Sequence, residues 1–248
     1  MLLSIITVTL NASGHLPGLV QSIRNQGRFD DVEWVVVDGA STDGTVDILR
    51  DNSDVVTRWI SERDCGLYDA LNKAVRLARG EFYVVLGADD RFDPGAFARM
   101  TDELKAAPDG DAWCFSVRRS GQMLVGREAT RMRRAIGWMR FNSSHSVGTV
   151  FRTSLHHRFG FYSTKYAVLA DGHFMLKLVD SGIRFKNVQW CVGEFVEGGA
   201  TSIDDVRLIA ETWLIQIHLG HSLWVQTLLF LARVARLSLR GSIRQKQK

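Results

Sequence analysis

Residues 35–45 read VVVDGASTDGT, an apolar run that stops at an aspartate and continues into a turn rich in glycine. A second stretch of similar design, YVVLGADD at residues 83–90, ends in two adjacent aspartates. In an open α/β sheet, ligands bind in the crevice outside the carboxyl ends of parallel strands, so carboxylates at these ends face a ligand rather than the core. The two stretches therefore predict strand ends that share one site.

The paired acids Asp89 and Asp90 indicate what that site holds. Hard divalent cations prefer oxygen ligands, and Mg²⁺ usually keeps coordination positions for the phosphates of a substrate. Two carboxylates at a strand end therefore favour a nucleoside diphosphate that is bound through a cation.

The composition is that of a soluble globular protein. The chain has 248 residues, of which 46% are hydrophobic and 23% are charged, as is ordinary for a soluble globular protein and unlike a disordered one. It has three prolines and no linker rich in glycine and serine, so we expect one domain, residues 1–202, with an appended helical tail, residues 203–248.

The cysteines and the N-terminus predict a cytoplasmic protein. Cys65, Cys114 and Cys191 are odd in number and widely spaced, which argues against a disulfide framework or a zinc site. Residues 2–8 read as a first strand rather than as a signal peptide, because no basic region or cleavage site accompanies them.

The positive charge is concentrated at the C-terminus. The net charge is +4, and no acid follows Glu211, whereas six basic residues do: Arg233, Arg236, Arg240, Arg244, Lys246 and Lys248. They follow an apolar run, residues 223–232, that is too short to span a bilayer. This pattern predicts an amphipathic helix on an anionic membrane surface or, equally, a helix packed on the domain with solvated charges. Aromatic residues are not interleaved with the basic ones, so we expect no nucleic acid partner.

Periodicity predicts an α/β fold with a mostly parallel sheet covered by helices. The expected strands are residues 2–9, 33–37, 55–60, 81–86, 112–117 and 183–192. The expected helices contain residues 16–23, 45–50, 68–80, 171–182 and 203–219; Gly80 is expected to close the third one. Asp93 and Pro94 predict the cap and first turn of a further helix. Arginines crowd residues 127–140, which we expect to be exposed and either solvated or in contact with an anion.

Six segments, in this order, resemble the glycosyltransferase family 2 enzymes: residues 4–11 (SIITVTLN), 38–45 (DGASTDGT), 61–73 (SERDCGLYDALNK), 86–90 (LGADD), 170–171 (AD) and 198–202 (GGATS). The resemblance implies a GT-A fold, which has a Rossmann-like, mostly parallel sheet flanked by helices. It also implies inverting, metal-dependent transfer of a sugar from a nucleoside diphosphate to a hydroxyl group. The acceptor would be a lipid-linked or cell-surface glycan, met on the inner face of the cell membrane.

The resemblance also implies which residues bind the donor. The end of the first strand would border the nucleotide through its backbone, and Asp38 would accept hydrogen bonds from the base. The remaining donor contacts would come from Asp64, Lys73 and Asp89. Together the implied donor-binding residues are Val8, Thr9, Leu10, Asn11, Asp38, Asp64, Lys73 and Asp89. For Lys73, a solvated ion pair with Asp69, four residues before it, is an equally good interpretation.

The metal and the catalytic base follow from the same resemblance. Asp90, together with Asp89, would coordinate Mg²⁺ or Mn²⁺, and helix capping does not explain the pair if Asp93 is already the cap. Asp171 would be the general base, although it could instead cap the helix that follows it. His145 and His173 are candidates for contacts with phosphate or acceptor, and each could equally be structural.

Two other functions compete with this interpretation. A sugar nucleotidyltransferase would carry a basic, glycine-rich phosphate loop after the first strand, but residues 10–15, LNASGH, contain no arginine or lysine. A non-catalytic, transferase-like partner in a membrane glycan assembly complex would not need the intact acids.

Overall fold

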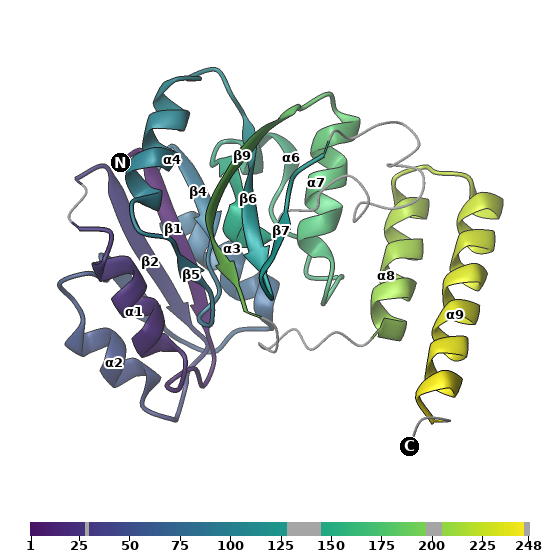
Figure 1. Ribbon diagram of the computed structural model, residues 1–248, viewed down its shortest axis with the longest axis horizontal. Helices are drawn as coiled ribbons and strands as arrows, with labels where there is room; N and C mark the ends of the chain where they lie inside the picture. The colour runs from purple at the N-terminus through teal and green to yellow at the C-terminus, as the bar shows by residue number, and fades with distance from the viewer. Residues whose placement is uncertain (28–29, 128–144, 197–204, 246–248) are drawn as a thin grey trace.

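The computed structural model describes residues 1–27, 30–127, 145–196 and 205–245, and Figure 1 shows their arrangement. In the described part of the chain, a nine-stranded sheet has the order β3-β2-β1-β4-β8-β6-β9-β5, and β7 pairs with β6. The strands are β1 Leu3–Thr9, β2 Val32–Asp38, β3 Arg58–Ser61, β4 Phe82–Val85, β5 Arg91–Phe92, β6 Ala112–Arg119, β7 Gln122–Leu124, β8 Thr149–Arg152 and β9 Phe185–Phe195.

Most strands run in one direction, as predicted. β1 pairs in parallel with β2 and β4, β2 pairs in parallel with β3, and β6 pairs in parallel with β9. Because β8 is antiparallel to both β4 and β6, those two strands also run the same way. The carboxyl ends of β1, β2, β3, β4, β6 and β9 therefore lie at one edge of the sheet, which we call the carboxyl edge.

Helices cover both faces of the sheet (Figure 1). They are α1 Leu16–Arg24, α2 Thr45–Asp51, α3 Leu67–Leu77, α4 Ala96–Lys105, α6 Leu155–Phe159, α7 Ala170–Asp180, α8 Asp205–His218 and α9 Leu223–Gln245. Alternate strand residues face opposite sides: Ile5 and Val36 pack with α1, α2 and α4, whereas Ile6 and Val37 pack with α3, α6, α7 and α8. Two buried clusters, one on each face, thus hold the sheet between its helices.

Two local predictions are wrong. α3 ends at Leu77 and Ala78 is already extended, so Gly80 does not close the helix. A Cβ on Gly80 would lie 2.6 Å from the backbone nitrogen of Ser4, so the glycine is required by close packing against β1. Asp93 does not cap α4, because that helix begins at Ala96 with Gly95 as its N-cap.

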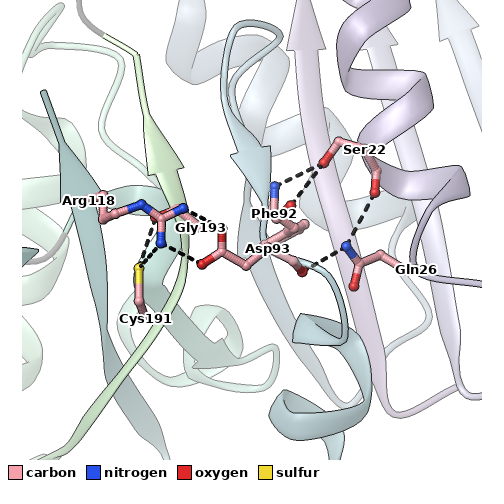
Figure 2. Close-up of polar contacts among 7 residues, drawn as sticks. All are labelled: Ser22, Gln26, Phe92, Asp93, Arg118, Cys191 and Gly193. Carbon is pink, nitrogen blue, oxygen red and sulfur yellow. Dashed lines mark hydrogen bonds and ion pairs between the residues drawn. The ribbon is translucent and has the colours of Figure 1, made fainter. Parts of the chain in front are cut away.

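Asp93 instead joins a polar network that fixes the segment after the paired acids (Figure 2). Its carboxylate forms an ion pair with Arg118 of β6, and its backbone carbonyl accepts a hydrogen bond from Gln26 Nε2 at 2.9 Å. The neighbouring Phe92 donates its backbone N–H to Ser22 Oγ at 2.9 Å. The residues directly after Asp90 are therefore anchored to both α1 and β6.

The tail forms two antiparallel helices, α8 and α9, and α9 is the outermost element in Figure 1. α8 is packed on the core through Ile215, which is fully buried. In the described part of the chain, no helix has the length and apolarity needed to cross a membrane. The division at residue 202 stays a prediction, and residues 128–140 and 198–202 lie outside the described residues.

Candidate active site

Four aspartates on three chain segments lie at the carboxyl edge. Asp38 ends β2, and Asp89 and Asp90 follow β4. Asp171 lies in the first turn of α7, which runs back to the start of β9 at the opposite edge, so this first turn is also at the carboxyl edge (Figure 1). The topology therefore brings the predicted donor, metal and base residues to one side of the sheet.

The loops after β1 and β2 hold each other in place. Asn11 has a positive φ of 50°, which asparagine tolerates better than most residues. Its backbone N–H donates to Ser41 Oγ at 2.8 Å, and its side-chain oxygen accepts the N–H of Thr42 at 3.0 Å. Ala12 N–H donates to Thr45 Oγ1 at 2.9 Å. These contacts give the predicted nucleotide-bordering segment a fixed shape.

Asp38 is fully buried, with an exposed fraction of 0%. Its carboxylate accepts four hydrogen bonds, from the hydroxyls of Thr9, Ser41 and Ser61 and from the backbone N–H of Ser41. Because these four hydrogen bonds occupy both oxygens, Asp38 can accept a hydrogen bond from the nucleotide base only if one of the four is broken. Its role with the nucleoside stays a prediction.

Asp64 lies next to this cluster. A Cβ built on Gly39 would be 2.5 Å from Asp64 Oδ2 and 3.4 Å from Leu10 Cδ1, so a larger residue there would displace the Asp64 carboxylate. Asp64 Oδ1 also accepts the backbone N–H of Gly66 at 2.9 Å, which fixes the turn into α3. Leu10 is exposed at this edge, and Val8 is half-buried behind it.

Lys73 forms ion pairs with two nearby acids. Its Nζ lies 2.7 Å from Glu62 and 3.6 Å from Asp69, and it donates to the carbonyl of Arg63 at 2.8 Å. The hydrogen bond with Glu62 raises the pKa of Lys73. The ion pair with Asp69, expected from their spacing, is thus present, and a donor contact of Lys73 stays a prediction.

Asp89 and Asp90 form a close carboxylate pair beside Gly87. A Cβ on Gly87 would lie 2.8 Å from Asp90 Oδ2 and 2.9 Å from Asp89 Oδ1, so a larger residue there would require these carboxylates to move. Asp90 is almost fully buried and accepts the backbone N–H of Gly87 at 2.9 Å and of Val196 at 3.3 Å. Burial, together with the charge of Asp89, raises the pKa of Asp90 to about 7.

The pair fits a divalent cation. A buried carboxylate next to a second one is stabilised by a nearby positive charge, and both are oxygen donors. Among the described residues, no group of three or more histidine, cysteine or acidic side chains could hold a metal ion. Further ligands would therefore come from substrate phosphates and water, as is typical of Mg²⁺ sites.

Asp171 is oriented by two hydrogen bonds to one oxygen. Oδ1 accepts the hydroxyl of Tyr68 and the backbone N–H of Gly172, each at 2.8 Å. Both of these bonds go to Oδ1, and Oδ2 takes part in neither. Burial raises the pKa of Asp171, against the lowering effect of the Tyr68 bond. The N-cap of α7 is Leu169 rather than Asp171, but Asp171 does accept the N–H of Gly172 in the first turn of that helix.

Glu211 of α8 fixes the segment before Asp171. Its carboxylate accepts the backbone N–H groups of Ala167, Val168 and Leu169 at 2.9 to 3.0 Å. Three such bonds to one buried carboxylate are charge-assisted and strong. The sequence predicts neither Glu211 nor Tyr68 as a site-forming residue; a lone acid in an otherwise apolar stretch of α8 is the available signal for Glu211.

The two candidate histidines differ in position. The His145 ring stacks on Phe195 at 3.7 Å, next to Val196, whose N–H contacts Asp90, so His145 lies near the paired acids. Burial lowers the pKa of His145 to about 4, which keeps it neutral. The His173 ring instead packs against Tyr166, which bonds to His218 of α8. His173 therefore lies on the side of the domain that α8 covers.

Comparison with known proteins assigns the family. A family model described as Glycosyl transferase family 2 matches residues 4–168. A PGL/p-HBAD biosynthesis glycosyltransferase of Mycobacterium bovis is 34% identical over 179 residues, which cover 70% of this chain and 68% of that protein.

Two solved structures share the fold. S. aureus TarS in complex with UDP-GlcNAc has a TM-score of 0.68 at 16% identity, covering 94% of this chain and 72% of that one. A mannosyltransferase from Pyrobaculum calidifontis in complex with GDP-Man and Mn²⁺ has a TM-score of 0.65 at 21% identity, covering 97% of this chain and 75% of that one. With its matched motifs on a GT-A scaffold, this chain belongs to glycosyltransferase family 2.

Proposed function

We propose that the protein is an inverting glycosyltransferase that moves a sugar from a nucleoside diphosphate to a hydroxyl group of a glycan or glycolipid acceptor. The observation that carries this proposal is the gathering of Asp38, Asp64, the pair Asp89 and Asp90, and Asp171 at one edge of the sheet. Membership of the family argues against a sugar nucleotidyltransferase and against a non-catalytic partner.

The donor would lie along the loops after β1, β2 and β3. The backbone of residues 8–11 and the side chains of Asp38 and Asp64 would border the nucleoside, and Asp89 would contact the ribose. The two structural neighbours described above, solved with UDP-GlcNAc and with GDP-Man, support a nucleotide sugar as the class of donor.

Asp90 and Asp89 would hold Mg²⁺ or Mn²⁺ between them and the diphosphate. When bound, the cation would neutralise negative charge on the diphosphate leaving group. The close approach of the two carboxylates across Gly87 supports this assignment, and the Pyrobaculum calidifontis neighbour was solved with Mn²⁺.

Asp171 would act on the acceptor side. As the acceptor oxygen bonds to the anomeric carbon, the bond from that carbon to the diphosphate breaks and Oδ2 of Asp171 takes the hydroxyl proton. A single in-line displacement of this kind inverts the anomeric centre and needs no covalent intermediate. Tyr68 and the N–H of Gly172 would hold Oδ1 so that Oδ2 faces the acceptor.

We infer a lipid-linked or cell-surface glycan acceptor from the relative named for PGL/p-HBAD biosynthesis. Such an acceptor would meet the enzyme at the cytoplasmic face of the membrane. This part of the proposal fits the basic C-terminal tail, which carries no acid after Glu211.

A thermal-shift panel of UDP-, GDP- and dTDP-sugars with Mn²⁺ tests the donor and the cation together. A ligand that binds only the native state at about 100 times its Kd stabilises it by about 2.7 kcal/mol, so one nucleotide class should raise Tm clearly. EDTA should abolish that shift and the transfer activity. Turnover that is unchanged in EDTA would exclude the cation, and no shift with any nucleotide would contradict donor binding.

Tyr68→Phe tests how the base is tuned. Because the Tyr68 hydroxyl lowers the pKa of Asp171, its loss should raise that pKa. A base must be ionised to accept a proton, so the acidic limb of the kcat/KM profile should move upward by about one pH unit. Tyr162→Phe is the matched control, because that hydroxyl bonds to Tyr83 rather than to Asp171. If the acidic limb of the kcat/KM profile did not move in Tyr68→Phe, the assignment of Asp171 as the general base would be contradicted.

A further inference from the structure

The outer face of α9 carries a row of exposed apolar side chains. Trp224, Leu228 and Leu231 are exposed to 80%, 68% and 56%, and their spacing of four and three residues puts them on one helical face. Val225 and Val234 extend the row at its margins. A contiguous apolar face of this kind usually marks an interaction site.

The opposite face of α9 is the one that packs on the protein. Trp213 of α8 donates its indole N–H to Thr227 at 3.2 Å, and its ring packs against Phe230 at 5.8 Å. Gln226, on the same side, is almost fully buried. α8 therefore covers the inner face only, and in Figure 1 the outer face of α9 points away from the rest of the described chain.

Charge indicates what covers the outer face. No acid of the given sequence occurs on α9 or after it, whereas Arg233, Arg236, Arg240 and Arg244 lie on α9 and Lys246 and Lys248 follow it. Arg236 is exposed, whereas one guanidinium nitrogen of Arg233 is buried on the inner side of the helix. A second copy of the chain would bring two basic helices together with no acid on either to offset their repulsion. An anionic lipid surface instead offers both an apolar layer for the row and negative headgroups for the exposed Arg236.

We propose that α9 docks on an anionic bilayer and lies in the plane of its surface, with the row of Trp224, Leu228 and Leu231 inserted below the headgroups. α8 starts after β9 and α9 runs back antiparallel to it, so the basic end of α9 is at the carboxyl edge (Figure 1). The proposal does not depend on the proposed reaction, because binding is measured without substrates.

Vesicle flotation with the full chain tests this surface. The protein should float with vesicles of phosphatidylcholine mixed with phosphatidylglycerol, should float far less with phosphatidylcholine alone, and should be released by rising salt. Leu228→Glu should weaken binding at least about tenfold, because it puts a negative charge into the apolar row. Arg236→Glu should weaken binding to the anionic vesicles only.

Met123→Glu on β7 is the matched control, since Met123 is also exposed and lies outside α9. It should bind vesicles like the unaltered protein, and circular dichroism should confirm that each variant is folded. Failure of the unaltered protein to bind anionic vesicles at low salt would overturn the proposal, as would normal binding by Leu228→Glu. A concentration-dependent dimer that Leu228→Glu dissociates, without vesicle binding, would assign the face to a second copy instead.

Discussion

Asp171→Asn is expected to lower kcat by about 10²-fold or more while the affinity for the donor stays close to that of the unaltered protein. Asparagine keeps an oxygen that can accept the bonds from Tyr68 and Gly172, so the geometry of the first turn of α7 should persist. Its amide cannot take a proton from an acceptor hydroxyl. The loss should therefore fall on the chemical step rather than on binding.

Initial-rate kinetics with a saturating donor, together with donor titration by calorimetry, separate the two effects for Asp171. Asp102→Asn is the matched control, because Asp102 is an exposed aspartate on α4. It should leave both quantities unchanged. If Asp171→Asn retained turnover within about tenfold of the unaltered protein, Asp171 would not be the base.

Asp90→Asn is expected to abolish most activity without destabilising the fold. Turnover should fall by about 10²-fold or more, because a cation held by one carboxylate would bind the diphosphate weakly. The pKa of Asp90 is raised from 3.8 to about 7, so the folded state holds a proton that the unfolded state has lost between these values. Stability therefore falls as pH rises through this range and levels off above it.

Thermal unfolding in EDTA between pH 4 and pH 8 checks the expected pH dependence of stability. Asp102→Asn is again the control. Asparagine removes the buried charge, so Asp90→Asn should flatten this dependence and keep or raise Tm at pH 8. A gain of about 1 kcal/mol corresponds to roughly 2–4 °C for a chain of this length. A lower Tm at pH 8 would mean that the bonds from Gly87 and Val196 matter more than the charge.

The sequence predicted the first half of the fold well because its signals there are local and agree with each other. The run at residues 35–45 became β2 and the turn into α2, and the run at residues 83–90 became β4 followed by the paired acids. Alternation along the strands separates Ile5 from Ile6 between the two faces of the sheet. The shorter strands β7 and β8 and the helix α6 carry no periodic pattern, and the sequence analysis did not predict them.

Site features formed by distant contacts were beyond sequence reasoning. Tyr68 and Asp171 are 103 positions apart, and Glu211 bonds to Leu169 across 42 positions, so neither contact leaves a local pattern. Local signals also failed where tertiary contacts competed with them. Asp93 has the residue type of a helix cap, but the ion pair with Arg118 engages its carboxylate instead.

Glu211 makes α8 a structural part of the carboxyl edge. Three amides that precede Asp171 depend on a carboxylate that belongs to α8. A chimera in which this sheet is joined to the C-terminal helices of another protein would need an acid at the position that corresponds to Glu211. Loss-of-function alleles are therefore to be expected in α8, far along the chain from Asp171 and from the paired acids.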